Sequence, residues 1–300
     1  MRESEAEVRH RLIAVPGATL HAVESGPPDG PPVVLLHGFP ETWWSWRHQL
    51  APLAAAGHRV VAIDLRGFGA SSKSGPFDLS TLAGDVAAVV ASLGRGPVPI
   101  VGHDWGGGAA WIAAARHPEA VSRVAVLNCP LPHVLQRALV RRPRWSQLKR
   151  SWYMFFFQLP WLPSWLLLRQ GARGVAGSIR NAAVVKTHMG RDELEPFCAA
   201  ALEPGAIAGM LGPYRAAFRD LLLRRGASDA GREVRVEQPA LLVWGADDPA
   251  LGFDELVPGS ERWVPRLRVE RLDGVGHFPQ SEAPERVTSL LLAFLAEDRS

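Results

Sequence analysis

Three side chains of this sequence could supply a nucleophile, an acid and a base. Asp104 lies in the turn GHDWG at residues 102–106, between the apolar run 97–101 and the small-residue stretch 109–115. This turn has the G-x-S-x-G spacing of a nucleophile elbow, with Asp in place of Ser. Asp248 and His277 follow later in the chain. Taken singly, each residue could be an ordinary capping, turn or surface residue. Together they follow the chain order nucleophile, acid, histidine, which is one of the orders found in catalytic triads and favours a catalytic site.

The carboxylate at position 104 decides the chemistry. An aspartate has an unperturbed pKa of about 4 and is already an anion at neutral pH, so it can attack carbon without a base. His277 would then act in a second step by taking a proton from water. Asp248 would orient its imidazole, as in a Ser-His-Asp triad. The N–H groups of Phe39 and Trp105 are the expected donors to an oxyanion.

The leaving group of such a substitution is a halide or an epoxide oxygen. An epoxide oxygen becomes an alkoxide and needs an acid, and tyrosine, with a pKa of about 10, can donate at neutral pH. The sequence contains two tyrosines, Tyr153 and Tyr214, each four residues before a phenylalanine, Phe157 or Phe218. That spacing also fits plain helical packing, so either tyrosine could be an ordinary aromatic of the interior.

Alternating strands and helices must position these residues. Apolar runs at residues 33–37, 59–63, 123–127 and 240–244 resemble strands that are buried on both faces. They predict an α/β fold with a mostly parallel, doubly wound sheet, in which ligands bind beyond the carboxyl ends of the strands. Asp64, Asp104 and Asn128 all follow strands in this way. Asn128 cannot carry the charge of the triad acid, which leaves Asp248 for that part.

A helical insertion interrupts the sheet. No strand-like run occurs between about residues 133 and 232, a segment rich in aromatic residues, Arg and Leu. We therefore expect the core to comprise residues 1–132 and 233–300, with a helical cap formed by 133–232. An aromatic cap implies an apolar pocket. The wall residues that we predict for this pocket are Phe39, Trp43, Trp105, Phe155, Trp161 and Phe278.

Composition excludes several other classes of protein. The 300 residues are 47% hydrophobic and carry 33 basic and 30 acidic side chains, a balance that gives no case for nucleic-acid binding. The two cysteines have neither C-x-x-C spacing nor a His cluster beside them, so a metal site or a disulfide framework is not expected. No motif of the sequence implies a cofactor. The charged N-terminus lacks the apolar core of a signal peptide, and polar residues and prolines break the apolar stretch 154–168. We expect a cytoplasmic protein without a membrane span and leave a homodimer open.

Five stretches of the sequence resemble the α/β-hydrolase epoxide hydrolases. They are HGFPETWWSWRHQL at residues 37–50, GHDWGG at 102–107 and GHF at 276–278, with WYMFFFQ at 152–158 and PYR at 213–215 in the insertion. The resemblance extends over nearly the whole chain, and its least similar part is the insertion between the two tyrosines. It implies an α/β-hydrolase fold with a helical cap over the sheet.

The resemblance also assigns roles. It makes Asp104 the nucleophile, His277 the base and Asp248 the acid that orients it, while Tyr153 and Tyr214 would hold the epoxide oxygen. The product would be a vicinal diol, formed from a small apolar epoxide and water through an alkyl ester on Asp104. The same resemblance implies a cis peptide bond before the proline of the HGFP sequence, residue 40.

Three other functions stay open at this point. Haloalkane dehalogenases share the Asp nucleophile but carry Asn or Glu after the HG pair, where this chain has Phe39. Fluoroacetate dehalogenases, the haloacid alternative, carry Arg after the nucleophile, where this chain has Trp105. A non-catalytic ligand-binding protein on the same fold is the third, since a fold alone does not define a function.

Overall fold

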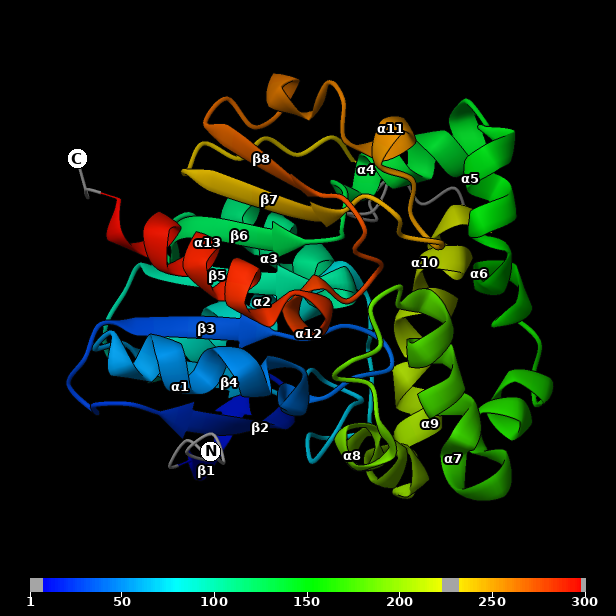
Figure 1. The fold of residues 1–300 in the computed structure, drawn as a ribbon, viewed down its shortest axis with the longest axis horizontal. Helices are drawn as coiled ribbons and strands as arrows, with labels where there is room; N and C mark the ends of the chain where they lie inside the picture. Colours follow the sequence, from blue (N-terminus) through cyan, green and yellow to red (C-terminus); the bar gives the residue numbers. More distant parts are fainter. Residues whose placement is uncertain (1–7, 223–231, 298–300) are drawn as a thin grey trace.

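The structure, a computed structural model, describes residues 8–222 and 232–297 and is built on an eight-stranded sheet (Figure 1). The strands are β1 (Val8–Val15), β2 (Ala18–Ser25), β3 (Pro32–Leu36), β4 (Arg59–Ile63), β5 (Val98–His103), β6 (Val121–Leu127), β7 (Ala240–Gly245) and β8 (Leu267–Leu272). Their order in the sheet is β1-β2-β4-β3-β5-β6-β7-β8. The pairs β1–β2 and β2–β4 are antiparallel and all later pairs are parallel, which confirms the predicted mostly parallel sheet.

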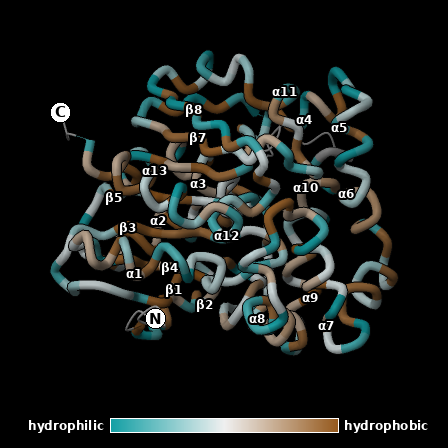
Figure 2. Tube along the Cα trace, in the orientation of Figure 1, coloured by the Kyte–Doolittle hydropathy of each residue, from teal (hydrophilic) through white to brown (hydrophobic). Residues whose placement is uncertain are grey.

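Alternating side chains along the strands form two hydrophobic cores, one on each face of the sheet. On one face Val34, Leu36 and Val61 pack with α2 (Leu79–Ser92) and α3 (Asp104–Arg116). On the other face Val33 and Leu35 pack with α1 (Arg47–Ala55) and α13 (Pro284–Ala296). Figure 2 shows the central strands as the hydrophobic middle of the fold. Strands buried on both faces explain the continuous apolar runs of the sequence.

The sheet changes its direction of winding at β3. This strand lies between β4 and β5, and Leu36 is paired with Gly102 near the carboxyl ends of β3 and β5. The loops after these two strands therefore meet at the topological switch point, where α/β sheets bind ligands. In the loop after β3, Thr42 accepts a hydrogen bond from the N–H of Trp44 and caps the 3₁₀ turn η1 (Trp43–Trp46), which precedes α1.

Helices alone form the described part of the segment between β6 and β7. They are α4 (Pro132–Gln136), the π-helical turn η2 (Arg137–Arg141), α5 (Trp145–Arg150), α6 (Trp152–Phe156), α7 (Leu162–Ala182), α8 (Arg191–Leu202), α9 (Ala206–Met210) and α10 (Gly212–Leu222). In Figure 1 most of them stand at the carboxyl ends of the strands. The predicted cap begins inside α4 and ends just beyond residues 223–231, which lie outside the described residues, so its bounds stay predictions.

Short helices complete the second part of the core. They are α11 (Phe253–Leu256), the 3₁₀ turn η4 (Ser260–Arg262) and α12 (Pro279–Glu282). Within the described ranges, no helix is both long enough and apolar enough to cross a bilayer. The loops that precede α11 and α12 carry Asp248 and His277, so both residues come from carboxyl ends of neighbouring strands, β7 and β8.

Candidate active site

A sharp turn between β5 and α3 presents Asp104. The strand runs directly into the helix, and Asp104 adopts a φ of +48°, which is strained for any residue with a side chain. A Cβ on Gly106 would lie 2.5 Å from the carbonyl oxygens of Leu36 and His37, and one on Gly102 would lie 2.4 Å from the Gly106 carbonyl oxygen. Only glycine fits at these two positions, as the elbow spacing predicts.

Two groups approach the carboxylate of Asp104. The backbone N–H of Phe39 donates to Oδ1 at 3.0 Å, and Nε2 of His277 lies 3.6 Å from Oδ2. Burial alone would raise the pKa of this carboxyl group, but the hydrogen bond and charge of His277 and the N–H of Phe39 together lower it. The N–H of Trp105 belongs to the first turn of α3, where amides have no acceptor within the helix. Asp104 is therefore an anion beside two potential oxyanion donors.

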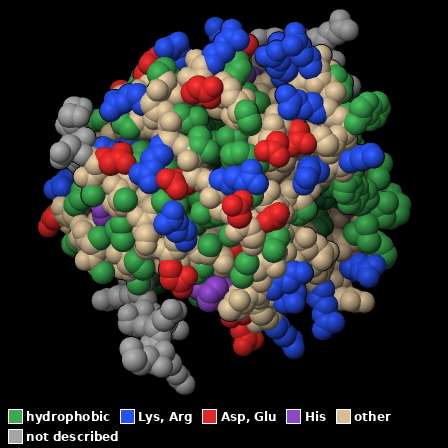
Figure 3. All heavy atoms as spheres, turned by 45° about the horizontal axis from the view of Figure 1, so that its top comes forward, with side chains coloured by type: hydrophobic (Ala, Val, Ile, Leu, Met, Phe, Trp, Pro, Cys, Tyr) green, Lys and Arg blue, Asp and Glu red, His purple; other side chains and the backbone are tan. Residues whose placement is uncertain are grey.

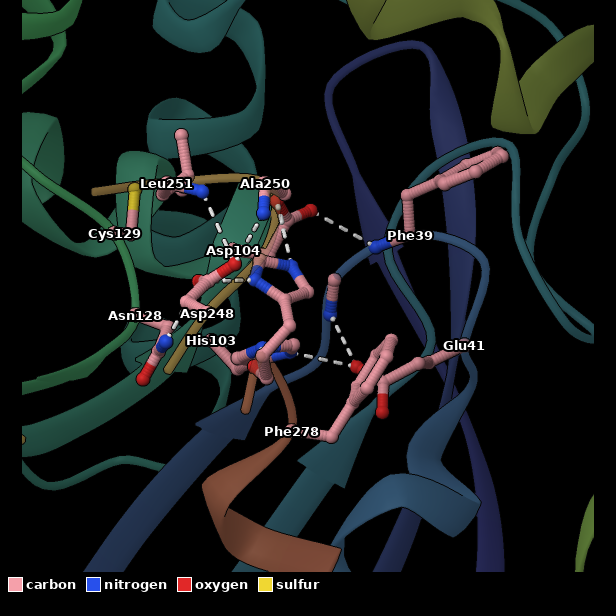
Figure 4. Close-up of polar contacts among 12 residues, drawn as sticks. Phe39, Glu41, His103, Asp104, Asn128, Cys129, Asp248, Ala250, Leu251 and Phe278 are labelled. Carbon is pink, nitrogen blue, oxygen red and sulfur yellow. Dashed lines mark hydrogen bonds and ion pairs between the residues drawn. The ribbon is translucent and has the colours of Figure 1, made fainter. Parts of the chain in front are cut away.

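The imidazole of His277 lies between two carboxylates. Its Nδ1 is 2.7 Å from Oδ2 of Asp248, and its Nε2 faces Asp104 (Figure 4). Burial alone would lower the pKa of His277. The charge of Asp248 and the hydrogen bonds to Asp104 and Asp248 outweigh burial, so the pKa of His277 lies well above its usual value. Both neighbouring carboxylates thus favour the protonated form of the imidazole in the resting site.

Asp248 is held rigidly by donors on both oxygens. It is fully buried, and its Oδ1 accepts hydrogen bonds from the N–H groups of Ala250 at 2.7 Å and Leu251 at 3.0 Å. Its Oδ2 accepts a bond of 2.7 Å from the side-chain amide of Asn128. These three donors leave the second lone pair of Oδ2 directed at His277, which sets the orientation of the ring.

Asn128 positions Asp248, a role that was not predicted from the sequence. Besides donating to Asp248, it accepts a hydrogen bond of 2.8 Å from the N–H of Gly245, so it joins the ends of β6 and β7. Its φ of +42° is a conformation that Asn tolerates better than most residues. From the sequence, this position was assessed only as a source of charge. Its place at a strand end was the available signal.

A second buried pair, Glu41 and His103, was also missed. Oε2 of Glu41 lies 2.7 Å from Nδ1 of His103 and accepts the N–H of Gly38 at 3.2 Å. Nε2 of His103 is 2.8 Å from the carbonyl oxygen of His277. Burial would raise the pKa of Glu41, but the charge and hydrogen bond of His103 lower it. The pair connects the loop that carries Phe39 to the loop that carries His277 (Figure 4).

Both tyrosines reach the site from helices of the segment between β6 and β7, where the cap is predicted. Tyr153 on α6 and Tyr214 on α10 lie edge to face, with ring centroids 6.0 Å apart. Both border a pocket of about 60 Å³ together with Asp104, and both also line a cavity of about 650 Å³ together with His277. Burial, and next the charge of Asp104, raise the pKa of each phenol well above its usual value. Both therefore remain protonated donors at neutral pH.

The larger cavity contains some of the predicted wall residues. Phe39 and Phe278 line it, and Trp105 lines the small pocket at Asp104 and an apolar cavity of about 120 Å³ beyond it. The ring of Tyr214 lies edge-on to Phe39 and Trp105, at centroid distances of 5.2 and 4.9 Å. The pocket at the carboxylate is thus lined mainly by aromatic and aliphatic side chains, among which Tyr153 and Tyr214 carry hydroxyl groups.

Four predicted wall residues do not line the cavity that His277 borders: Trp105, as described above, and Trp43, Trp161 and Phe155. Trp43 packs edge-on against His10 and Trp44 at the base of η1. Trp161 is 69% exposed at the start of α7, and Phe155 lines only the 120 Å³ cavity. The peptide bond between Phe39 and Pro40 is cis, as expected.

Comparisons with known proteins agree with this geometry. Residues 31–284 match the α/β hydrolase fold family. The chain is 34% identical to epoxide hydrolase 3 of Xenopus tropicalis, covering 98% of this chain and 80% of that protein. It is 31% identical to epoxide hydrolase A of Mycobacterium tuberculosis, covering 95% of this chain and 96% of the relative.

Solved structures give the same result. The crystal structure of Bacillus megaterium epoxide hydrolase in complex with an inhibitor superposes with a TM-score of 0.83 and 29% identity. That superposition covers 96% of this chain and 100% of the solved one. Epoxide hydrolase A from Mycobacterium thermoresistibile superposes with a TM-score of 0.80 and 29% identity, over 97% of this chain and 99% of the other.

Proposed function

The chain belongs to the α/β-hydrolase fold family and is an epoxide-hydrolase-like member of it, and from that premise we propose that it opens an apolar epoxide to a vicinal diol through an ester on Asp104. One observation carries the proposal. The ionised carboxylate of Asp104 lies between the N–H of Phe39 and the imidazole of His277 and borders the same small pocket as two protonated tyrosines. Nucleophile and acid therefore share one pocket, and the base, 3.6 Å from the nucleophile, lines the larger cavity that the same two tyrosines border.

In the first step, an oxygen of Asp104 attacks a carbon of the epoxide ring. A carbon–oxygen bond of the ring breaks as the new ester bond forms, and the released oxygen takes a proton from the hydroxyl of Tyr153 or Tyr214. The phenols suit this task because burial keeps them protonated. Their position on the cap lets them hold the oxygen while the sheet holds the nucleophile.

In the second step, His277 removes a proton from a water molecule, whose oxygen attacks the carboxyl carbon of Asp104. The oxyanion that forms is stabilised by the N–H groups of Phe39 and Trp105. Its collapse expels the diol oxygen, which takes the proton that His277 removed from water. The proton left on the carboxyl group of Asp104 passes to the tyrosinate of the first step, which restores both the carboxylate and the phenol. Asp248, held by Asn128, stabilises the imidazolium that exists during this step.

The charge on Asp104 couples the two steps. In the resting enzyme this charge helps to raise the pKa of His277. Ester formation removes it, so the pKa of the imidazole falls at the point in the cycle where a neutral base is needed. The positive imidazolium likewise keeps the pKa of Asp104 low before attack. Each group thus prepares the other for its own step.

This coupling predicts a separation of the two steps by pH. Attack needs only ionised Asp104, whose pKa lies below the usual value, so ester formation should persist in mildly acidic solution. Hydrolysis needs neutral His277, whose pKa is still raised by the charge and hydrogen bond of Asp248 when Asp104 is an ester, so this step should slow as pH falls. We expect the ester to accumulate at about pH 5 and not at pH 8, measured by intact-protein mass during turnover. Equal ester occupancy at both pH values would contradict the assignment of hydrolysis, and not of attack, to neutral His277.

A dehalogenase is the alternative that uses the same nucleophile. Displacement of a halide needs N–H donors around the leaving group, whereas Phe39 offers no side-chain donor and two phenols face Asp104. The test compares styrene oxide with 1-bromobutane and measures diol by chromatography and bromide by ion chromatography, with Asp104→Ala as control. Diol without bromide supports the proposal. Bromide without diol would replace it with dehalogenation, and neither product would replace it with a binding role.

A further inference from the structure

Positive charge is concentrated in one part of the cap. Residues 120–191 include no Asp or Glu but contain twelve Lys and Arg residues. The remaining 21 basic and 30 acidic side chains make the rest of the chain net negative. Eight of the twelve cations lie between residues 137 and 173. The small net charge of the protein therefore conceals a strongly basic region.

The same region exposes large hydrophobic side chains. Trp145 is 78% exposed, Trp161 69%, Trp152 62% and Trp165 55%. Val140, Phe155 and Leu159 are also exposed, whereas the rest of the described chain exposes only Leu12, Val184, Leu202 and Val269. Scattered exposed apolar residues are normal, but a group of this size indicates an interaction surface.

These side chains share one side of the molecule, which we call the cap face. It comprises the exposed side chains of residues 140–173, on η2, α5, α6 and α7. Figure 1 shows α5, α6 and α7 following one another along the side of the cap away from the sheet. Figure 3 shows hydrophobic side chains gathered at that edge, with Lys and Arg around them. Along α7, Trp161, Trp165 and Arg169 recur every four residues, and the Arg169 guanidinium lies 5.8 Å from the Trp165 ring centroid.

We propose that the cap face docks on the surface of an anionic lipid bilayer. Indole rings are well suited to the headgroup region, since they combine a large apolar body with one N–H donor. Arginine and lysine around them are attracted to anionic lipids, and their aliphatic stems remain among the apolar side chains. A surface with both features, and without a single acidic residue in its own segment, is complementary to such a membrane in charge and in polarity.

A second copy of the chain fits this face less well. A symmetric dimer pairs the same patch with itself, and the eight cations between residues 137 and 173 would then face eight others. A nucleic acid would match the charge, but it would leave aliphatic side chains such as Val140 and Leu159 without an apolar partner. A bilayer interface satisfies the cations and the aliphatic groups together.

Residues of the cap face also line two cavities of the site. Trp152 and Arg169 line the 650 Å³ cavity that contains His277, and Val140 and Phe155 line the apolar cavity behind Trp105. Docking would therefore direct both cavities toward the membrane, where apolar epoxides dissolve. This delivery of substrate rests on the proposed function, whereas the docking itself does not.

The experiment is co-sedimentation of the full chain with vesicles of phosphatidylcholine alone or with about 30% phosphatidylglycerol. Two variants remove the two features separately, Trp145→Ser/Trp165→Ser and Arg141→Gln/Arg142→Gln/Arg144→Gln. Leu12→Ser, which removes an exposed apolar residue of β1, is the matched control. We expect at least about tenfold more protein on the anionic vesicles, and about tenfold less for either cap variant but not for the control. Hydrolysis of water-soluble epoxide without vesicles should be unchanged in all three.

Three outcomes would overturn the docking proposal. The first is equal or no sedimentation with the two kinds of vesicle. The second is binding to single-stranded DNA that the arginine variant loses and the tryptophan variant keeps, which would make the face a polyanion site. The third is a dimer, seen by light scattering, that the tryptophan variant dissociates. A wild type that sediments but hydrolyses no epoxide would instead overturn only the proposed function.

Discussion

Replacement of His277 by Gln should give a protein that reacts once with its epoxide and then stops. Asp104 is ionised without help from a base, so the ester still forms. Its hydrolysis loses the imidazole that we assign to take a proton from water, and Gln cannot replace it. Removal of a general base lowers a rate by about 10²–10⁴-fold, and we expect turnover to fall by that amount.

Intact-protein mass spectrometry measures this trapped state directly. After excess styrene oxide, the His277→Gln variant should be heavier by one substrate molecule, with the adduct on the peptide that contains Asp104. Asp104→Asn is the matched control, because it is nearly isosteric but is not an anion, and it should show no adduct. A folded His277→Gln variant that stays unmodified would mean that the imidazole is needed for attack, and the assignment of the two steps would be wrong.

The double substitution Tyr153→Phe/Tyr214→Phe should abolish ring opening. Without either hydroxyl the epoxide oxygen must leave as a bare alkoxide inside an apolar pocket. Loss of one preorganised donor typically costs about 10²–10³-fold in rate. We therefore expect each single variant to retain measurable activity, because one phenol remains, and the double variant to lose at least about 10³-fold. The rate of ester formation, followed by rapid quench and mass spectrometry, is the measurement.

Packing provides the control for this prediction. Both rings stay in place as phenylalanines, so their contacts with Phe157 and with Phe39 are retained. The urea midpoint of unfolding should therefore change little, since the tyrosine hydroxyls are removed without creating a large cavity. Wild-type rates in the double variant would mean that both tyrosines serve only packing and that another group is the acid.

The nucleophile turn was predictable because its constraints are local. Gly102 and Gly106 are required by contacts within a few ångströms, and the strained residue between them is set by the strand and helix that flank it. The buried strands could be predicted equally well, because a parallel strand that is covered on both faces must be apolar throughout. Together these features fixed the sheet edge at which Asp104, Asp248 and His277 meet.

Other carboxylates at the same edge could not be sorted by sequence. Asp64 also follows a central strand, but the structure directs its oxygens to the N–H groups of Trp43 and Ala70 and to the ring of His21. The carboxylate of Glu41 lies within hydrogen-bond distance of the His103 ring, at 2.7 Å. Such partners come from distant positions in the chain, so position at a strand end did not separate a structural carboxylate from Asp104.

The cap was the least predictable part for the same reason. Its aromatic residues indicated helices but not which ring faces the site. Tyr153 faces inward and Trp152, its neighbour, is mostly exposed, a difference set by how α6 lies against α10. Trp161 was expected in the wall and instead belongs to the cap face. Helical spacing fixes relative directions along one helix but not the orientation of that helix on the core.

The origin of the new oxygen atom tests the central claim most directly, because a carboxylate and a water molecule cannot both make the first attack. The measurement is one turnover in heavy-oxygen water with enzyme in excess of epoxide, followed by mass analysis of the diol and of the peptide that contains Asp104. If Asp104 makes the first attack, we expect unlabelled diol and one heavy oxygen in the Asp104 carboxylate. A labelled diol with an unlabelled peptide would contradict it.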